Sequence, residues 1–260
     1  MTATATSPYL SIIIPFYGTA DRQWLQRCLD SIRQQGFDEV IETLVVDDGG
    51  KGPGGARNKG IRQATGDYLL FVDADDYLMP CCLERCLPWL KQHSPDMFSF
   101  GMVRVNESEQ PQLPPSYITP MPVRCYPSGA AYMWRHNFFG TVWHHFFRRE
   151  FITGNALLFA EERFHQDEDF LLKAYSLAGK TLVTDTPHYV YVKHALSITH
   201  SSTLAMRLRR LADFRAMLRR VSAHIRTLPP ASLARRAACR RYLFLQADYV
   251  QQMVRNLCRL

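Results

Sequence analysis

The sequence predicts an α/β fold: a doubly wound, mostly parallel sheet flanked by helices, with a helical appendage at the carboxyl end. Three observations predict it. Short apolar runs alternate with helix-like stretches through the first hundred residues, an order typical of parallel sheets. Several of these runs end in acidic residues. Beyond Thr203 the pattern changes to two arginine-studded amphipathic helices, so we divide the chain into residues 1–202 and 203–260.

The elements can be justified in chain order. The run over 10–16 is rich in isoleucine, as a buried strand should be. Apolar residues then recur at helical spacing from Leu25 to Ile32. The expected elements are strands over 10–16, 42–46, 68–72 and 97–105, helices over 21–35, 56–64, 80–92, 128–137 and 167–177, a glycine-rich turn over 51–55, a loop or strand pair over 106–127, and an extended stretch over 181–192.

The charge is unevenly distributed along the 260 residues. Beyond Thr203 there are thirteen arginines, no lysine and two acids, Asp213 and Asp248. Such a segment favours contact with an anionic membrane surface or an acidic partner. The alternative is that these helices pack on the rest of the chain or form a homodimer. The aromatic residues of this segment accompany no known nucleic-acid motif, so we expect no nucleic acid.

The seven cysteines are odd in number and lie mostly in expected helices, which favours a reducing, cytoplasmic location. Cys81, Cys82 and Cys86 could form a soft-metal cluster, but no histidine or cysteine at suitable spacing completes it. No apolar stretch reaches about 18 residues, and the amino terminus lacks the features of a signal peptide. We therefore expect a soluble protein, or one peripheral to the inner face of the cell membrane.

Three carboxylates follow the apolar run that ends at Val72: Asp73, Asp75 and Asp76. Carboxylates at the carboxyl end of a buried strand must meet water, a cation or a ligand. Their hard oxygen atoms suit Mg²⁺ or Mn²⁺, which commonly bind through protein carboxylates and substrate phosphates. The sequence therefore predicts a metal-nucleotide site, with these three aspartates as candidate metal ligands.

Other polar residues fall at comparable places. Asp47 and Asp48 end the second strand, and Arg57 and Asn58 stand at an expected helix start, where they can meet a diphosphate. Turn and surface roles are the alternative for each. The glycine-rich turn lacks both the phosphate-loop spacing and the dinucleotide-binding fingerprint, which excludes those two classes of nucleotide-binding protein.

Five motifs occur in the order Ser11-Ile12-Ile13-Ile14-Pro15-Phe16-Tyr17, Leu44-Val45-Val46-Asp47-Asp48-Gly49, Gly55-Ala56-Arg57-Asn58-Lys59-Gly60, Gly66-Asp67-Tyr68 and Phe71-Val72-Asp73-Ala74-Asp75-Asp76. Together they resemble the family 2 glycosyltransferases, inverting enzymes of the GT-A fold. The resemblance covers residues 9–200 and leaves the carboxyl-terminal segment outside it. About seven residues separate the acidic turn from the Ala-Arg-Asn motif, fewer than the family usually has.

The resemblance implies a role for each matched position. The expected nucleotide-sugar ligands are Pro15 and Tyr17 in the base pocket, Asp48 accepting from the base, Asp47 supporting that turn, Arg57 and Asn58 near the diphosphate, and Asp73 facing the ribose. Asp75 would hold Mn²⁺ or Mg²⁺, with Asp76 close by.

The catalytic base of the family sits in a Glu-Asp-x-x-Phe motif at the head of a helix. The matching stretch here is Gln166-Asp167-Glu168-Asp169-Phe170, with glutamine in place of glutamate. The resemblance makes Asp167 the base. A shifted alignment makes it Asp169, and a cluster of acids that only caps the helix is a third interpretation.

Candidate acceptor residues lie between these motifs. The resemblance places Trp143 where an acceptor sugar could stack on its ring, although tryptophan is more often part of a core. His194 and His200 could reach the metal or the phosphates, or could be ordinary surface histidines.

The resemblance implies an inverting, metal-dependent glycosyltransferase of hexosyltransferase type. It would move a sugar from a nucleotide diphosphate, UDP favoured, to a hydroxyl of a growing bacterial surface polysaccharide or its lipid-linked precursor. Two alternatives remain: a sugar-nucleotide pyrophosphorylase, and a non-catalytic module that binds a sugar nucleotide or nucleic acid.

Overall fold

The computed structural model describes residues 7–16, 21–36, 40–113, 117, 120–161, 164–194 and 203–257. Within these ranges a single eight-stranded sheet has the order β2-β1-β3-β7-β5-β8-β4, with β6 paired to β8. The strands are β1 (Leu10–Phe16), β2 (Ile41–Asp47), β3 (Tyr68–Phe71), β4 (Tyr77–Leu78), β5 (Met97–Asn106), β6 (Arg124–Tyr126), β7 (His145–Arg148) and β8 (Thr181–Lys193). The helices are α1 (Arg22–Arg33), α2 (Gly52–Gln63), α3 (Cys82–His93), α4 (Gly129–Arg135), α5 (Arg149–Gly154), α6 (Gln166–Leu177), α7 (Leu204–Thr227) and α8 (Leu233–Leu257).

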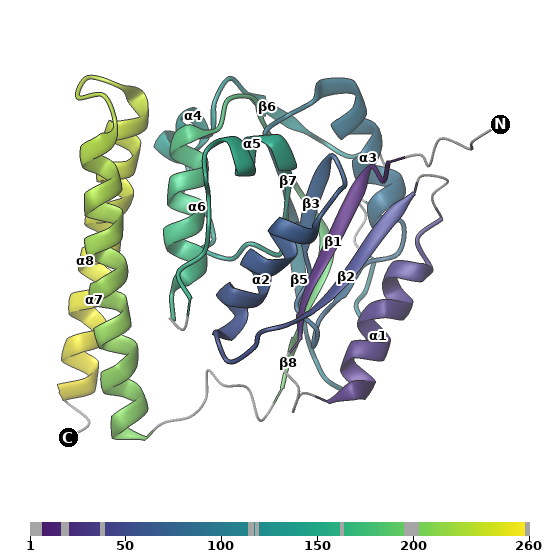
Figure 1. Cartoon of the computed structure of the whole chain (residues 1–260), viewed down its shortest axis with the longest axis horizontal. Helices are drawn as coiled ribbons and strands as arrows, with labels where there is room; N and C mark the ends of the chain where they lie inside the picture. Colours follow the sequence, from purple (N-terminus) through teal and green to yellow (C-terminus); the bar gives the residue numbers. More distant parts are fainter. Residues whose placement is uncertain are drawn as a thin grey trace.

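The sheet is mostly parallel, as the sequence predicts. β1 pairs in parallel with β2 and β3, and β5 pairs in parallel with β8. β7 runs antiparallel between β3 and β5, so these two halves point the same way. The carboxyl ends of β1, β2 and β3 therefore meet at one edge of the sheet, where open α/β sheets bind ligands (Figure 1).

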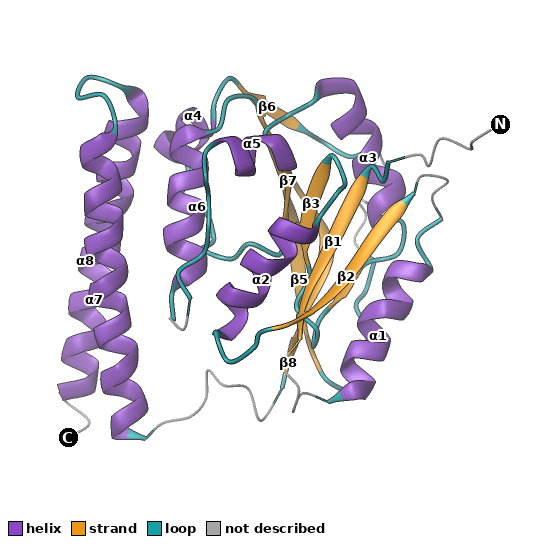
Figure 2. Ribbon diagram, viewed as in Figure 1, coloured by secondary structure: helices purple, strands orange, loops and turns teal. Residues whose placement is uncertain are grey.

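The sheet is covered on both faces, because side chains alternate across it along each strand. Ile13 belongs to a core cluster shared with α2, α4, α6, α7 and α8, whereas Ile12 and Ile14 belong to a second cluster shared with α1 and α3. Figure 2 shows the resulting layers, with α1 and α3 on one side and α2 and α6 on the other. This arrangement confirms the doubly wound fold.

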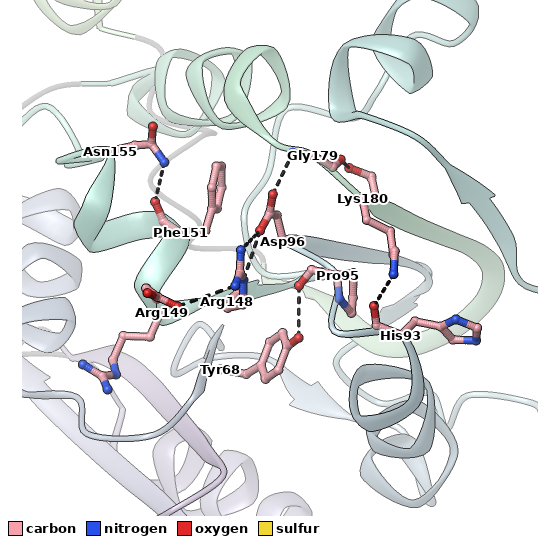
Figure 3. Close-up of polar contacts among 12 residues, drawn as sticks. Tyr68, His93, Pro95, Asp96, Arg148, Arg149, Phe151, Asn155, Gly179 and Lys180 are labelled. Atoms are coloured by element: carbon pink, nitrogen blue, oxygen red, sulfur yellow. Dashed lines mark hydrogen bonds and ion pairs between the residues drawn. The ribbon is translucent and has the colours of Figure 1, made fainter.

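The opposite edge of the sheet is tied together by Asp96, which directly precedes β5 (Figure 3). Its carboxylate accepts hydrogen bonds from Arg148 Nε at 3.0 Å and from the Gly179 N–H at 2.7 Å. Beside it the Tyr68 hydroxyl donates to the Pro95 carbonyl at 3.0 Å. These contacts join the amino ends of β3, β5 and β8 to the end of β7 and so hold four strands in register.

The glycine-rich stretch differs from its prediction. The expected turn over 51–55 is mostly the first turn of α2, which begins at Gly52. A Cβ atom at Gly54 would lie 1.9 Å from Gln166 Oε1 and 2.6 Å from the Ala160 carbonyl oxygen. Gly54 therefore permits close packing of α2 against the segment that leads into α6, and it does not form a loop for phosphate.

The carboxyl-terminal helices pack on the rest of the chain. Phe214, Met217 and Val221 of α7, the first of the two predicted amphipathic helices, are buried in the cluster that contains Leu171 and Leu172 of α6. The alternative that these helices pack on the rest of the chain is therefore confirmed. A dimer, a membrane contact and a domain boundary near residue 203 stay predictions. Among the described residues, no helix is long and apolar enough to span a membrane.

Asp96 offers a test of the fold. Replacement by alanine leaves Arg148 and the Gly179 N–H without their acceptor, so Asp96→Ala should lower the free energy of unfolding by about 2–3 kcal/mol. Asp185→Ala is the matched control, because Asp185 also pairs with an arginine, Arg124, but its side chain is 79% exposed. Its loss should stay below about 1 kcal/mol. Urea unfolding of both variants measures the difference, and equal losses would contradict the role given to Asp96.

Candidate functional site

The acidic turn after β2 is held in shape by its own side chains. Asp47 accepts from the Gly49 N–H at 2.8 Å, and Asp48 accepts from the Gly50 N–H at 2.9 Å. Both glycines have positive φ, +58° and +80°, which favours glycine there. The second oxygen of Asp48, Oδ2, is buried and has no hydrogen-bond partner among the described residues. Such an oxygen is suited to accept from a ligand N–H group.

Residues of β8 hold the acidic turn after β3 in place through hydrogen bonds. The Tyr189 hydroxyl accepts from the Asp73 N–H at 3.1 Å and donates to Asp76 Oδ2 at 2.8 Å. The Val192 N–H donates to the other carboxylate oxygen of Asp76 at 2.8 Å. Asp76 is 1% exposed, and burial raises the pKa of its carboxyl well above the usual value. Both oxygens of Asp76 thus serve the turn, which differs from the metal-ligand role that the sequence predicts.

Asp75 has a different environment from Asp76. Its main-chain oxygen accepts from Arg27 at 2.9 Å and lies 3.3 Å from His194 Nε2. In the described part of the chain, no other residue donates a hydrogen bond to its carboxylate. Burial, and then the nearby charge of Asp73, raises the pKa of Asp75. Arg27 and His194 lower this pKa but do not offset the rise, so a bound cation would further stabilise the ionised carboxylate.

Arg57 joins two acidic segments. One terminal nitrogen donates to Asp73 Oδ1 at 2.7 Å and the other to Asp167 Oδ1 at 2.9 Å. The guanidinium lies 5.5 Å from the centre of the Phe159 ring, and the side chain is 4% exposed. The sequence predicts a diphosphate contact for Arg57. In the structure both terminal nitrogens of the guanidinium bind carboxylates, so Arg57 holds Asp73 and Asp167 together. We call this pair of contacts the Arg57 clamp.

Asn58 is also used inside the protein. Its side-chain nitrogen donates to the Phe159 carbonyl at 3.0 Å, and its oxygen accepts from the Phe159 N–H at 2.8 Å. Asn58 is 2% exposed. The side chain predicted to lie near the diphosphate therefore fixes the backbone of the segment that leads to α6.

Three consecutive acids at the head of α6 point in three directions. Asp167 reaches Arg57, and its side chain is 18% exposed. Glu168 makes a two-pronged ion pair with Arg241 of α8, at 2.8 and 2.7 Å. Asp169 is 1% exposed and pairs with Arg220 of α7 at 2.6 Å. Among the three, Asp167 is the one that faces the other site residues.

Asp167 is poised between opposing influences. Burial raises the pKa of its carboxyl, whereas the positive charge of Arg57 lowers it, and the balance stays above the usual value. A general base is most effective when its pKa approaches the working pH, so the direction of this shift suits such a role. Asp169 instead has a buried ion pair, which favours a structural part in place of the alternative base.

The remaining predicted residues lie as follows. Pro15 is partly exposed near the end of β1 and opposite Val46. Trp143 is 3% exposed and stacks on Tyr189, with ring centres 4.3 Å apart. Its indole ring is therefore too buried to stack on the expected acceptor sugar. His194 is 4% exposed, and its ring centre lies 3.9 Å from that of Trp24, with the two rings tilted by 34°. Tyr17 and His200 lie outside the described residues.

Sequence reasoning missed Tyr189, Arg220 and Arg241. The arginines were noticed only as part of a basic segment, and Tyr189 lies in an apolar strand whose sequence gives no sign of a polar contact. Each acts on a partner at least 51 residues away, so no local spacing could reveal the pairing.

The sequence and the fold are similar to those of known glycosyltransferases. The sequence model of the family described as "Glycosyl transferase family 2" matches residues 11–51 and 49–154, which are more than half of the chain. The chain belongs to this family. An uncharacterized glycosyltransferase of Bacillus subtilis, EpsJ, is 28% identical over 222 residues, which cover 74% of the chain and 63% of that protein. The family 2 chain thus spans less than two thirds of this curated relative.

TarS of Staphylococcus aureus, a poly(ribitol-phosphate) beta-N-acetylglucosaminyltransferase, is 26% identical over 209 residues, 70% of the chain and 35% of that protein. The structure of TarS residues 1–349 with UDP-GlcNAc has a TM-score of 0.66, 20% identity, and coverage of 94% of this chain and 72% of that chain. A mannosyltransferase of Pyrobaculum calidifontis, solved with GDP-Man and Mn²⁺, has a TM-score of 0.58 and 16% identity over 98% of this chain and 74% of that chain. These likenesses show the GT-A fold.

Members of this fold family commonly use a divalent cation, and the residues present fit one. The Asp75 carboxylate accepts no hydrogen bond from another described residue, and Asp73 accepts from Arg57 through Oδ1 and keeps Oδ2 for an ion. Carboxylate oxygens are the ligands that Mn²⁺ and Mg²⁺ prefer. Asp75 and the second oxygen of Asp73 are therefore the groups that would hold the ion.

This fit predicts how the metal affects stability. Because burial and Asp73 disfavour ionised Asp75, Asp75→Asn should leave the melting temperature of the metal-free protein unchanged or higher. Millimolar Mn²⁺ should raise the melting temperature of the parent protein and leave that of the variant unmoved. Differential scanning fluorimetry with and without chelator measures both. An equal metal-dependent rise in the two proteins would remove Asp75 from the metal site.

Proposed function

We propose that this protein is an inverting glycosyltransferase that transfers a sugar from a nucleotide diphosphate sugar to a hydroxyl of a surface-polysaccharide acceptor. The observation that carries the proposal is the Arg57 clamp, which brings Asp167 to the acids that end β3. Asp73 and Asp75, proposed to bind the metal and the donor, thereby lie near Asp167, a carboxylate of raised pKa. The solved relatives bound to UDP-GlcNAc and to GDP-Man support a nucleotide-sugar donor.

The donor would lie across the turns that end β2 and β3. Asp48 Oδ2, an oxygen without a partner in the described residues, would accept from an N–H of the base. Asp73 would face the ribose, and Pro15 would line the base pocket. UDP is the favoured nucleotide because TarS, which is 26% identical to this chain over 209 residues, has been solved with UDP-GlcNAc and with UDP.

Transfer requires an acceptor hydroxyl that loses its proton as its oxygen attacks the anomeric carbon. In the proposed step Asp167 takes that proton, the new carbon–oxygen bond forms, and the bond to the diphosphate oxygen breaks on the opposite face. The electron pair of that broken bond leaves with the diphosphate. A bound Mn²⁺ or Mg²⁺ would supply electrostatic stabilisation of the leaving diphosphate.

Arg57 would orient the base in this step. Its hydrogen bond to Asp167 Oδ1 leaves Oδ2 without a side-chain donor among the described residues, so Oδ2 could take the acceptor proton. The same guanidinium limits how far burial raises the pKa of Asp167. The carboxyl would then stay ionised at neutral pH while keeping more proton affinity than an exposed aspartate.

We propose that the enzyme is cytoplasmic and that its acceptor is a glycan or a lipid-linked glycan. It would contact the membrane peripherally, or form a dimer, through α7 and α8. Exposed apolar side chains on α8, including Leu243, Val250 and Val254, offer a surface for either contact.

Membership of glycosyltransferase family 2 disfavours the alternative function of a sugar-nucleotide pyrophosphorylase. The unpartnered Asp75 carboxylate and the clamped Asp167 disfavour a non-catalytic module.

The base assignment predicts different effects for two neighbouring aspartates. Asp167→Asn should reduce transfer by about 100-fold or more, with the affinity for nucleotide diphosphate retained, because the amide cannot take the proton. Asp169→Asn removes a charge paired with Arg220, so it should lower stability and leave kcat per folded molecule within a few-fold. Transfer assays and nucleotide titrations on both variants decide. A large kcat loss confined to Asp169→Asn would favour the shifted alignment.

The donor class can be tested without knowing the acceptor. UDP, GDP, CDP and TDP are each added with Mn²⁺, Mg²⁺ or chelator, and the melting temperature is recorded. UDP with metal should give the largest rise, since a ligand that binds only the folded state raises apparent stability. Asp48→Ala should diminish this rise, whereas Asp185→Ala should not. No shift with any diphosphate at millimolar concentration would overturn the proposed function.

A further inference from the structure

Two cysteines and a histidine converge in the core behind the acidic turns. Cys82 and Cys86 lie one helical turn apart on α3, and His188 comes from β8, more than 100 residues later. All three are fully buried. The two sulfurs and a ring nitrogen of His188 lie within 4.8 Å of one another. The structure thus supplies the histidine that the sequence spacing could not provide for these cysteines.

The hydrogen bonds around His188 favour one tautomer of its ring. The Tyr117 hydroxyl donates to the Pro187 carbonyl at 2.7 Å, so its oxygen is free to accept from His188 Nδ1–H at 3.0 Å. The neutral ring then has an unprotonated Nε2 with a free lone pair. Burial lowers the pKa of His188 to about 3, which is consistent with a neutral ring. Metal-binding histidines are commonly oriented in this way through the other nitrogen.

A fourth soft atom lies beside the free nitrogen. The Met121 sulfur is 3.1 Å from His188 Nε2, although a thioether has no proton to donate to that nitrogen. Met121 also belongs to the buried core cluster that contains Cys82 and Cys86. Thiolate, thioether and imidazole ligands together select thiophilic d¹⁰ ions, whereas carboxylates select Mg²⁺ and Mn²⁺.

We propose that Cys82, Cys86 and His188 form a binding site for a thiophilic d¹⁰ ion, Zn²⁺ or Cu⁺, with Met121 in the fourth position. Binding forms two metal–thiolate bonds, one metal–thioether bond and one metal–nitrogen bond, and the two thiol protons are released to solvent. Ligands about 2.3 Å from a tetrahedral ion lie about 3.7 Å apart. The 4.8 Å limit on the present separations therefore requires only a small closure of the side chains.

The site would fasten α3 to β8. The residue after His188 is Tyr189, whose hydroxyl holds the Asp73 N–H and the Asp76 carboxylate. An ion bound at His188 would therefore restrain the strand that supports the acidic turn. It would be a structural ion, separate from the cation expected at Asp75.

The test uses the full-length chain, refolded or expressed under reducing conditions with Zn²⁺, with Co²⁺ or with Cu⁺. Metal analysis after desalting should find one tightly held ion per chain. With Co²⁺, thiolate-to-metal charge-transfer absorption and the intense visible bands of tetrahedral coordination should appear. Competition against a chromophoric chelator for each metal separates Zn²⁺ from Cu⁺.

Two kinds of variant make the outcome decisive. Cys82→Ala with Cys86→Ala should abolish the retained ion and the cobalt bands, and His188→Ala should weaken both. Cys81→Ala is the matched control, because Cys81 is the exposed neighbour of Cys82, and it should bind like the parent. Asp75→Asn should also keep the ion, which separates this site from the carboxylate site.

Three results would overturn the proposal. The first is a parent protein that retains no thiophilic ion after folding in its presence and shows no thiolate–cobalt absorption. The second is an ion lost in Asp75→Asn and kept in the double cysteine variant. The third is a Cys82–Cys86 disulfide that persists under the reducing conditions. The parent protein provides the first readout, so poor folding of a variant leaves the test intact.

Discussion

The buried guanidinium of Arg57 is the interaction on which the rest of the site depends. It joins Asp73, 16 residues away, to Asp167, 110 residues away. Without it, the two carboxylates would repel one another. With it, each has a positive partner, and the planar fork sets their separation. The distance between the β3 turn and the head of α6 is thus fixed by a single side chain from α2.

The same principle extends through the first turn of α6. Successive residues of a helix point about 100° apart, so Asp167, Glu168 and Asp169 must face three different neighbours. Each neighbour supplies an arginine: Arg57 from α2, Arg241 from α8 and Arg220 from α7. Part of the basic charge beyond Thr203 therefore serves acids of the same chain. The carboxyl-terminal helices also orient the helix that carries the proposed base, which explains why they share its core.

Local patterns predicted the elements whose hydrophobic spacing is regular, such as β1, α1 and β3, and the acidic turn after Val72. The fold class followed from their order. Contacts between distant segments could not be predicted in this way. The helical start of α2 depends on Gly54 approaching Gln166, and the burial of Trp143 depends on Tyr189. Arg57 and Asn58, for which the motif suggested diphosphate contacts, also join segments that are far apart in the sequence.

The satisfaction of each carboxylate distinguishes structural acids from functional ones. Asp76 and Glu168 have hydrogen-bond or ion-pair partners on both oxygens, and this compensates for their burial. Asp48 keeps a buried oxygen without a partner in the described chain, and no other described residue donates a hydrogen bond to the Asp75 carboxylate. A folded protein tolerates that deficit where a ligand supplies the missing partner, because binding then gains what folding left unmade. The unmet oxygens lie on the turns after β2 and β3, at the edge of the sheet where the donor nucleotide and its cation would bind.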